Sequence, residues 1–114
     1  MVETESFRSI ALTFKEVTEQ KHFEKASFRV RKKIFATLDA TQRKAVLKLP
    51  EIDQSVFCLM GTIFQAVPGA WGKKGWTEVD LEEVSYEILQ DALTIAFCTV
   101  APSSLGNNYL NNEY

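Results

Sequence analysis

Two tryptophans enclose two lysines in the segment Trp71-Gly72-Lys73-Lys74-Gly75-Trp76. Indole rings stack on nucleic-acid bases and lysine ammonium groups neutralise phosphates, so this composition fits a nucleic-acid contact. The two glycines allow the backbone to approach a neighbouring group closely. The spacing differs from the GxxxxGK[ST] phosphate-binding loop, so we expect no nucleotide cradle of that kind. The same residues also fit a structural role, in which the tryptophans anchor an exposed lysine turn to the core.

Positive charge is concentrated in one part of the chain. Nine of the 13 Lys and Arg residues lie between residues 21 and 48, where Glu24 and Asp39 are the only acids, although the formal net charge of the whole chain is −2. This asymmetry predicts a positive and a negative side of one domain. The alternative is that the charges only protect solvated strands from edge-to-edge aggregation. The candidate DNA-binding residues are Arg29, Arg31, Lys32, Lys33, Lys44, Lys48, Trp71, Lys73, Lys74 and Trp76.

The residues that could support catalysis or bind a metal do not form a known pattern. His22 is the only histidine and has no nucleophile motif near it. Cys58 and Cys98 lie among apolar residues at a spacing that matches neither a zinc motif nor a redox pair. Carboxylates gather between Glu78 and Asp91, where they complement a helix dipole, but no calcium-binding loop is present. We expect no enzymatic activity, no cofactor and no metal.

The length and composition predict one small globular domain. With 114 residues, 46% of them apolar, the chain has the material for a single core. No apolar run reaches the length of about 18 residues that a membrane span requires. Glu3, Glu5 and Arg8 interrupt the region where a signal peptide would be apolar. We expect a cytoplasmic protein, a monomer or weak homodimer, that does not contact membranes.

Hydrophobic periodicity predicts three helices, over residues 4–15, 51–60 and 81–100. The second follows Pro50 and stops at Gly61, and the third follows Asp80 as its cap. In the second, Ile52, Val56, Leu59 and Met60 share one side. The domain is expected to cover residues 1–102, followed by a polar, flexible tail over 103–114.

Alternating apolar residues predict five strands, over residues 27–31, 33–38, 43–49, 63–67 and 76–79, with 16–26 irregular. The first hairpin link, at Lys32 and Lys33, lacks the Gly or Asn of a tight turn, so a longer loop or a bulge is an alternative. The order α-β-β-β-α-β-β-α predicts an α+β fold. It would be a two-layer sandwich of an antiparallel five-stranded sheet with helices on one face.

Alternation along the strands also divides the sheet into two faces. The set expected in the core is Ile34, Ala36, Leu38, Ala45, Leu47 and Leu49, with Arg29 and Arg31 at one edge. The set expected on the open face is Phe28, Val30, Phe35, Thr37, Lys44, Val46 and Lys48, with Trp76 beside it. A slip of one residue would exchange the two faces.

Several of these segments together resemble the MmcQ/YjbR family of small bacterial proteins. The shared runs are Lys21-His22-Phe23, Ser27-Phe28-Arg29-Val30-Arg31, Ile34-Phe35-Ala36-Thr37-Leu38, Ala45-Val46-Leu47-Lys48-Leu49, Pro68-Gly69-Ala70 with the Trp-Lys-Lys-Trp segment, and Val79-Asp80-Leu81. The resemblance covers about residues 7–102. It implies a double-wing fold akin to the secretion-chaperone-like sandwich, and a DNA-binding role without enzymatic activity. Family members commonly have Gly in the first hairpin, where this chain has Lys32.

Two functions from different classes follow. The first is DNA binding through the basic strand meander and the loop at residues 71–76. The second is a protein- or peptide-interaction module that uses an open apolar face of Phe28, Val30, Phe35 and Val46. A small-molecule pocket under Trp71 and Trp76 is a third interpretation.

Overall fold

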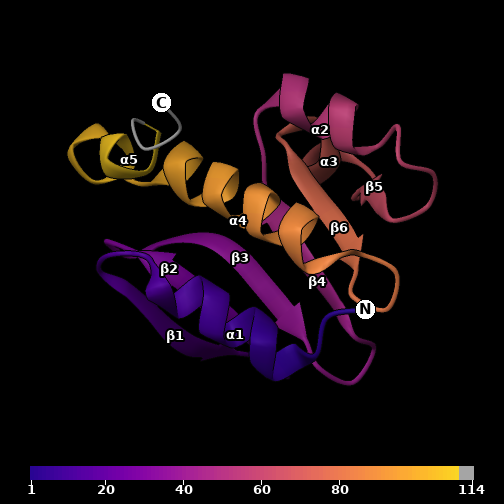
Figure 1. Cartoon of the computed structure of the whole chain (residues 1–114), viewed down its shortest axis with the longest axis horizontal. Coiled ribbons are helices and arrows are strands. Elements are labelled where there is room, and N and C mark those ends of the chain that lie inside the picture. The colour runs from indigo at the N-terminus through magenta and orange to yellow at the C-terminus, as the bar shows by residue number, and fades with distance from the viewer. Residues whose placement is uncertain (111–114) are drawn as a thin grey trace.

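The computed structural model describes residues 1–110, which form one antiparallel sheet with helices packed against it (Figure 1). The elements are α1 (Thr4–Thr13), β1 (Val17–His22), β2 (Lys25–Val30), β3 (Lys33–Asp39), β4 (Lys44–Lys48), α2 (Glu51–Phe57), β5 (Phe64–Ala66), α3 (Ala70–Lys73), β6 (Trp76–Asp80), α4 (Tyr86–Val100) and α5 (Ser103–Leu110). The strand order is β1-β2-β3-β4-β6-β5. The α+β class and the antiparallel sheet are confirmed, but the sheet has six strands rather than five.

The additional strand is β1, which lies in the segment expected to be irregular. Its partner is β2, with Val17 opposite Val30 and His22 opposite Lys25. The inward position at its centre is Glu19, whose carboxylate accepts hydrogen bonds from Arg8 of α1. Because an ion pair takes the place of an apolar contact there, β1 lacks the apolar alternation by which a strand is recognised in sequence.

The core lies between the sheet and the two helices α1 and α4, which cross the same face of it (Figure 1). Aromatic rings join the two layers: Phe7 of α1 meets Phe28 with ring centroids 5.6 Å apart, and Phe35 meets Phe97 of α4 at 5.7 Å. All four rings are fully buried. Aromatic pairs in this edge-to-face arrangement stabilise a core by about 0.5–1.5 kcal/mol beyond the area that they bury.

Because β3 contains a bulge, several residues lie on the opposite face of the sheet from the one expected. The register shifts after the pair Phe28–Ala36, and the next pair is Arg29–Ile34, so that Phe35 is left without a partner. Phe28, Val30 and Phe35 therefore face the helices and are buried, and their placement on the open face was wrong. Arg29 and Ile34, expected on the core side, lie on the open face. The other expected positions are confirmed: Ala36, Leu38, Ala45, Leu47 and Leu49 are buried in the core, and Thr37, Lys44, Val46 and Lys48 are only partly buried.

The first hairpin turns at Arg31 and Lys32, one residue earlier than expected. Val30 pairs with Lys33, and the two residues between them have φ angles of 48° and 71°. Two positive φ angles in a two-residue loop are the signature of a type I′ turn, which normally takes Asn or Gly. The sequence cue for a longer loop was therefore misleading, and Arg31 lies in the turn rather than at the edge of the core.

Helices α2 and α4 differ from expectation in their bounds and in the residues that they bury. Helix α2 is shorter than 51–60 and buries only Phe57, while Ile52, Val56 and Leu59 are exposed. Helix α4 begins after Ser85, whose hydroxyl accepts a hydrogen bond from the backbone of Ile88, so Ser85 rather than Asp80 is its cap.

Residues 103–110 of the expected flexible tail form α5, and residues 111–114 lie outside the described part of the chain. No helix within residues 1–110 combines the length and the apolar composition needed to cross a bilayer.

Candidate nucleic-acid interface

The sheet face opposite α1 and α4 brings together residues from four strands. Cross-strand partners point to the same side of a sheet. The pairs on this side include Arg29–Ile34, Thr37–Val46 and Lys48–Trp76. We call this side the open face.

A groove of about 290 Å³ lies on the open face. Its lining residues are His22, Lys25, Ile34, Thr37, Val46, Val67, Trp71 and Trp76. The middle strands supply Ile34, Thr37 and Val46, the β1–β2 hairpin supplies His22 and Lys25, and the segment around α3 supplies Trp71. The groove therefore runs between a hairpin on one side and a tryptophan on the other, over a mainly apolar floor.

The two tryptophans of the Trp-Lys-Lys-Trp segment form one aromatic unit with two cations. Their ring centroids are 6.4 Å apart at an interplanar angle of 67°. Lys48 Nζ lies 5.4 Å from the Trp76 ring, and Lys74 Nζ lies 5.7 Å from the Trp71 ring. Lys48 Nζ also donates a hydrogen bond to the backbone carbonyl of Lys74. Trp71 is 62% exposed, so one of the two rings is open to a ligand.

The glycines of this segment allow two close backbone contacts, as their positions in the sequence suggested. A Cβ at Gly72 would lie 1.9 Å from the carbonyl oxygen of Val67, and one at Gly75 would lie 2.0 Å from that of Leu49. Gly75 also has a φ of +103° and accepts a hydrogen bond from the Leu49 amide at 2.9 Å. These contacts are with the chain itself, and they fix the backbone on both sides of the lysines.

Gln54 of α2 holds the same segment from the other side. Its Nε2 donates to the carbonyl of Gly72 and to the hydroxyl of Thr77, each at 3.0 Å. Thr77 is fully buried, and its hydroxyl donates in turn to the Gly75 carbonyl. The carbonyl groups of Gly72 and Gly75, on either side of the lysines, therefore have hydrogen-bond partners within the protein.

Four of the cations on the open face have no carboxylate partner within residues 1–110. They are Lys25, Lys48, Lys74 and Arg29, and Arg29 Nε donates instead to the Ser27 hydroxyl at 3.1 Å. At the other end of the same strands Lys44 lies 3.6 Å from Glu78, and its register partners are Asp39 and Asp80. The open face therefore has a basic, aromatic end and an acidic end.

The remaining sequence-predicted residues lie elsewhere. Arg31 in the β2–β3 turn binds Glu16 at 3.0 Å, and this hydrogen bond lowers the pKa of Glu16 and raises that of Arg31. Lys32 and Lys33 extend from the tip of the same hairpin. Lys73 lines a separate hollow beside α2. Of the ten predicted residues, five come together at the basic end: Arg29, Lys48, Trp71, Lys74 and Trp76.

Sequence reasoning missed the hairpin side of the groove. His22 and Lys25 belong to the polar segment that was taken as irregular, and Ile34 was assigned to the core. The Lys21-His22-Phe23 run was the available signal, because it places an imidazole and a phenyl ring next to a basic residue. Without the β1–β2 pairing, nothing local connects this run to Trp71.

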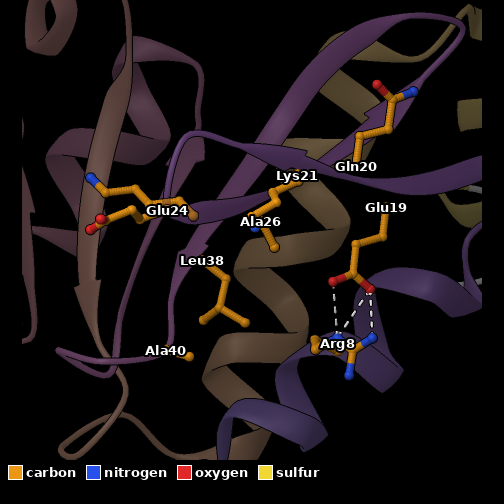
Figure 2. Close-up of a pocket in the computed structure, with 9 residues that line it drawn as sticks. Arg8, Glu19, Gln20, Lys21, Glu24, Ala26, Leu38 and Ala40 are labelled. Carbon is orange, nitrogen blue, oxygen red and sulfur yellow. Dashed lines mark hydrogen bonds and ion pairs between the residues drawn. The ribbon is translucent and has the colours of Figure 1, made fainter.

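A further hollow lies on the helix side of the sheet edge, between α1 and β1 (Figure 2). Figure 2 shows Glu19 pointing toward Arg8, while Gln20 points to the opposite side of β1. Arg8 binds both Glu19 and Glu5 at 2.8 Å, and these hydrogen bonds, led by that of Glu19, raise its pKa. Because two carboxylates already neutralise Arg8, we do not take this hollow as the anion-binding site.

No group of three or more His, Cys, Asp or Glu side chains in the part of the chain that the structure describes is close enough to hold an ion.

Comparison with known proteins shows the family. A family model described as YjbR matches residues 12–99. The chain belongs to the YjbR family. No curated protein matches the sequence of this YjbR domain.

A solved structure has a similar fold, the crystal structure of Deinococcus radiodurans protein DR2400, described by the family-model domain DUF419. The TM-score is 0.77 at 21% sequence identity, over 95% of this chain and 88% of that chain. At this identity the likeness shows the fold alone.

Proposed function

We propose that this YjbR-family protein binds nucleic acid through the basic end of its open face. Trp71 and Trp76 would supply the ring surfaces, and Lys48, Lys74 and Arg29 would contact phosphates. The observation that carries the proposal is the pair of lysines, each over a tryptophan ring and without a carboxylate partner in residues 1–110. Aromatic rings that stack bases beside cations that track the backbone are the recurring components of such surfaces.

The net charge of −2 does not oppose this proposal, because Glu78, which lies opposite Val46 of the groove, is paired with Lys44 at 3.6 Å. Asp39 and Asp80 are the strand partners of the same lysine, farther along β4 from Lys48. Exposed charges are screened over about 8–10 Å at physiological ionic strength. A phosphate beside Lys48 and Lys74 therefore responds mainly to those two cations.

Salt dependence tests the proposal. Three phosphate contacts predict that the logarithm of the association constant falls with the logarithm of salt concentration with a slope of about −2 for a single strand and about −3 for a duplex. Fluorescence anisotropy of labelled oligonucleotides between 50 and 200 mM salt measures this slope. The Lys48→Ala/Lys74→Ala variant should have a shallower slope, by about 1.4 for a single strand.

The matched control is Lys15→Ala/Lys73→Ala, which removes the same charge from other surfaces. It should retain the slope of the unmodified protein. An equal loss in both variants would mean that binding responds only to total charge, and the open face would then not be the site.

The protein-interaction alternative loses the residues on which it was built. Phe28, Val30 and Phe35 are each no more than 1% exposed, so a partner cannot reach them in the folded chain. Of the four residues, only Val46 lines the groove. We therefore carry nucleic-acid binding forward alone.

A further inference from the structure

Phe23, at the tip of the β1–β2 hairpin, is 86% exposed. Its ring contacts the imidazole of His22, with centroids 4.9 Å apart, and no other ring contact joins it to the described chain. A large apolar side chain left in water contributes little to folding, since burial is the source of its stabilising free energy.

The backbone at Phe23 is also unfavourable for this residue. His22 pairs with Lys25, so Phe23 and Glu24 form a two-residue turn, and Phe23 has a φ of 59°. Glycine is the usual residue where the first turn position has positive φ. Phenylalanine therefore occupies a strained position from which its ring points into solvent. Strain of this kind is typical of functional sites.

The hairpin stands across the groove from Trp71. His22 and Lys25, which flank Phe23 and Glu24, line the groove together with Trp71 and Trp76. The same four hairpin residues line a hollow of their own, which adjoins the groove through His22 and Lys25. An exposed aromatic ring thus stands on each side of the groove, with Lys25 on one side and Lys74 on the other.

We propose that the ligand is a single strand of nucleic acid, whose unpaired bases stack on Phe23 and on Trp71. This inference rests on the proposed function and names its substrate class. The ring faces of bases in a duplex are already covered by neighbouring base pairs, so only a strand with unpaired bases can stack on both side chains.

The test is Phe23→Gly in the full chain, measured for affinity and stability together. We expect binding of a deoxythymidine oligonucleotide to weaken about 5- to 150-fold, the effect of losing one stacked base. The urea midpoint should stay the same or rise, because glycine tolerates the positive φ. Trp71→Ala should weaken binding similarly. Leu59→Ala, which shortens another exposed apolar side chain on the α2 side, should leave binding unchanged.

Three outcomes would overturn the inference while leaving the proposed function standing. These are unchanged oligonucleotide affinity in Phe23→Gly, a lowered urea midpoint in that variant, and equal affinity for a duplex of the same length. Comparison of oligouridine with oligodeoxythymidine distinguishes RNA from DNA as the source of the strand, and a loss of affinity in Phe23→Gly with either probe supports the inference. If the unmodified protein binds none of these probes at 50 mM salt, the proposed function itself fails.

Discussion

At the scale of single residues, the β2–β3 turn contains two side chains in a conformation that suits neither. Lys32 has a φ of 71° and makes no ion pair within residues 1–110. Because the left-handed conformation costs an L-residue about 1 kcal/mol, Lys32→Gly should raise the free energy of unfolding by roughly that amount. Urea denaturation at neutral pH measures the change.

Lys33→Gly is the matched control, since it removes the same charge from the next position. Lys33 is the first residue of β3, where glycine has no strain to relieve and weakens the strand. This variant should be less stable than the unmodified protein. Equal stabilisation by both variants would show that charge repulsion at the tip, rather than backbone strain, limits the stability of the hairpin.

The ion pair between Arg31 and Glu16 beside this turn predicts that the stability of the fold depends on pH. The hydrogen bond from Arg31 lowers the pKa of Glu16 below its ordinary value of 4.5. A carboxyl group whose pKa is lower in the folded state stabilises the fold above the unfolded pKa, and the contribution is lost as pH falls through the folded pKa. Glu16→Gln should therefore destabilise the protein at pH 7 and have a smaller effect at pH 3.

Urea midpoints at the two pH values measure this difference. Asp91→Asn, which changes an exposed carboxylate of α4 without an ion-pair partner in residues 1–110, should show no such pattern. A Glu16→Gln effect of the same size at both pH values would contradict an electrostatic origin.

At the scale of elements, sequence predicted the strands that have apolar alternation and missed the one that does not. Ala45 and Leu47 identify β4 because both alternate positions are buried. In β1 the corresponding inward residue is Glu19, which binds Arg8 eleven residues earlier in the chain. The bulge at Phe35 has no sequence cue either, because it depends on how β2 and β3 pair. These failures all concern interactions between elements rather than properties of one element.

Substitution of Gly75 tests whether its close approach to Leu49 holds the Trp-Lys-Lys-Trp segment in place. In Gly75→Ala the added methyl group would clash with the Leu49 carbonyl oxygen, 2.0 Å away. Gly75 also has a φ of +103°, so overpacking and backbone strain both destabilise the variant. The free energy of unfolding should fall by roughly 2–4 kcal/mol. Gly61 has a φ of +76° with nothing within 4 Å of its would-be Cβ, so Gly61→Ala should cost only about 1 kcal/mol.

Chemical denaturation of the two variants compares these costs. If they lose equal stability, the approach of Gly75 to Leu49 does not hold α3 and β6 in place. The tryptophans would then depend on Gln54 and Thr77 alone for their position.

At the scale of the whole molecule, the candidate site was only half visible in the sequence. The basic segment and the Trp-Lys-Lys-Trp segment are each continuous in the sequence, and both were recognised there. Their convergence depends on β6 pairing with β4, with β5 on its outer side, which sets Trp76 beside Lys48. The same strand register places Lys44 opposite Asp39 and Asp80. The position of a lysine in the basic segment of the sequence therefore does not determine whether it has a carboxylate partner.

The C-terminal helix predicts that the folded unit extends beyond residue 102. Tyr109 of α5 lies with its ring centroid 5.2 Å from both Phe14 and Phe97, and its hydroxyl accepts a hydrogen bond from the Lys15 amide at 2.9 Å. This one side chain therefore joins α1, α4 and α5 at the end of the core. A chain ending at residue 102 should unfold with a free energy about 3 kcal/mol below that of a chain ending at residue 110, since it loses a packed aromatic ring.

Tyr109→Phe separates the ring from its hydroxyl, because it retains the aromatic contacts and loses only the hydrogen bond. It should cost about 1 kcal/mol. Asn108→Ala, at an exposed position of the same helix, should cost less than either change. Equal urea midpoints for the chains ending at 102 and 110 would show that α5 adds nothing to the fold, and that the stacked pair of Phe14 and Phe97, 4.9 Å apart, closes this end of the core without it.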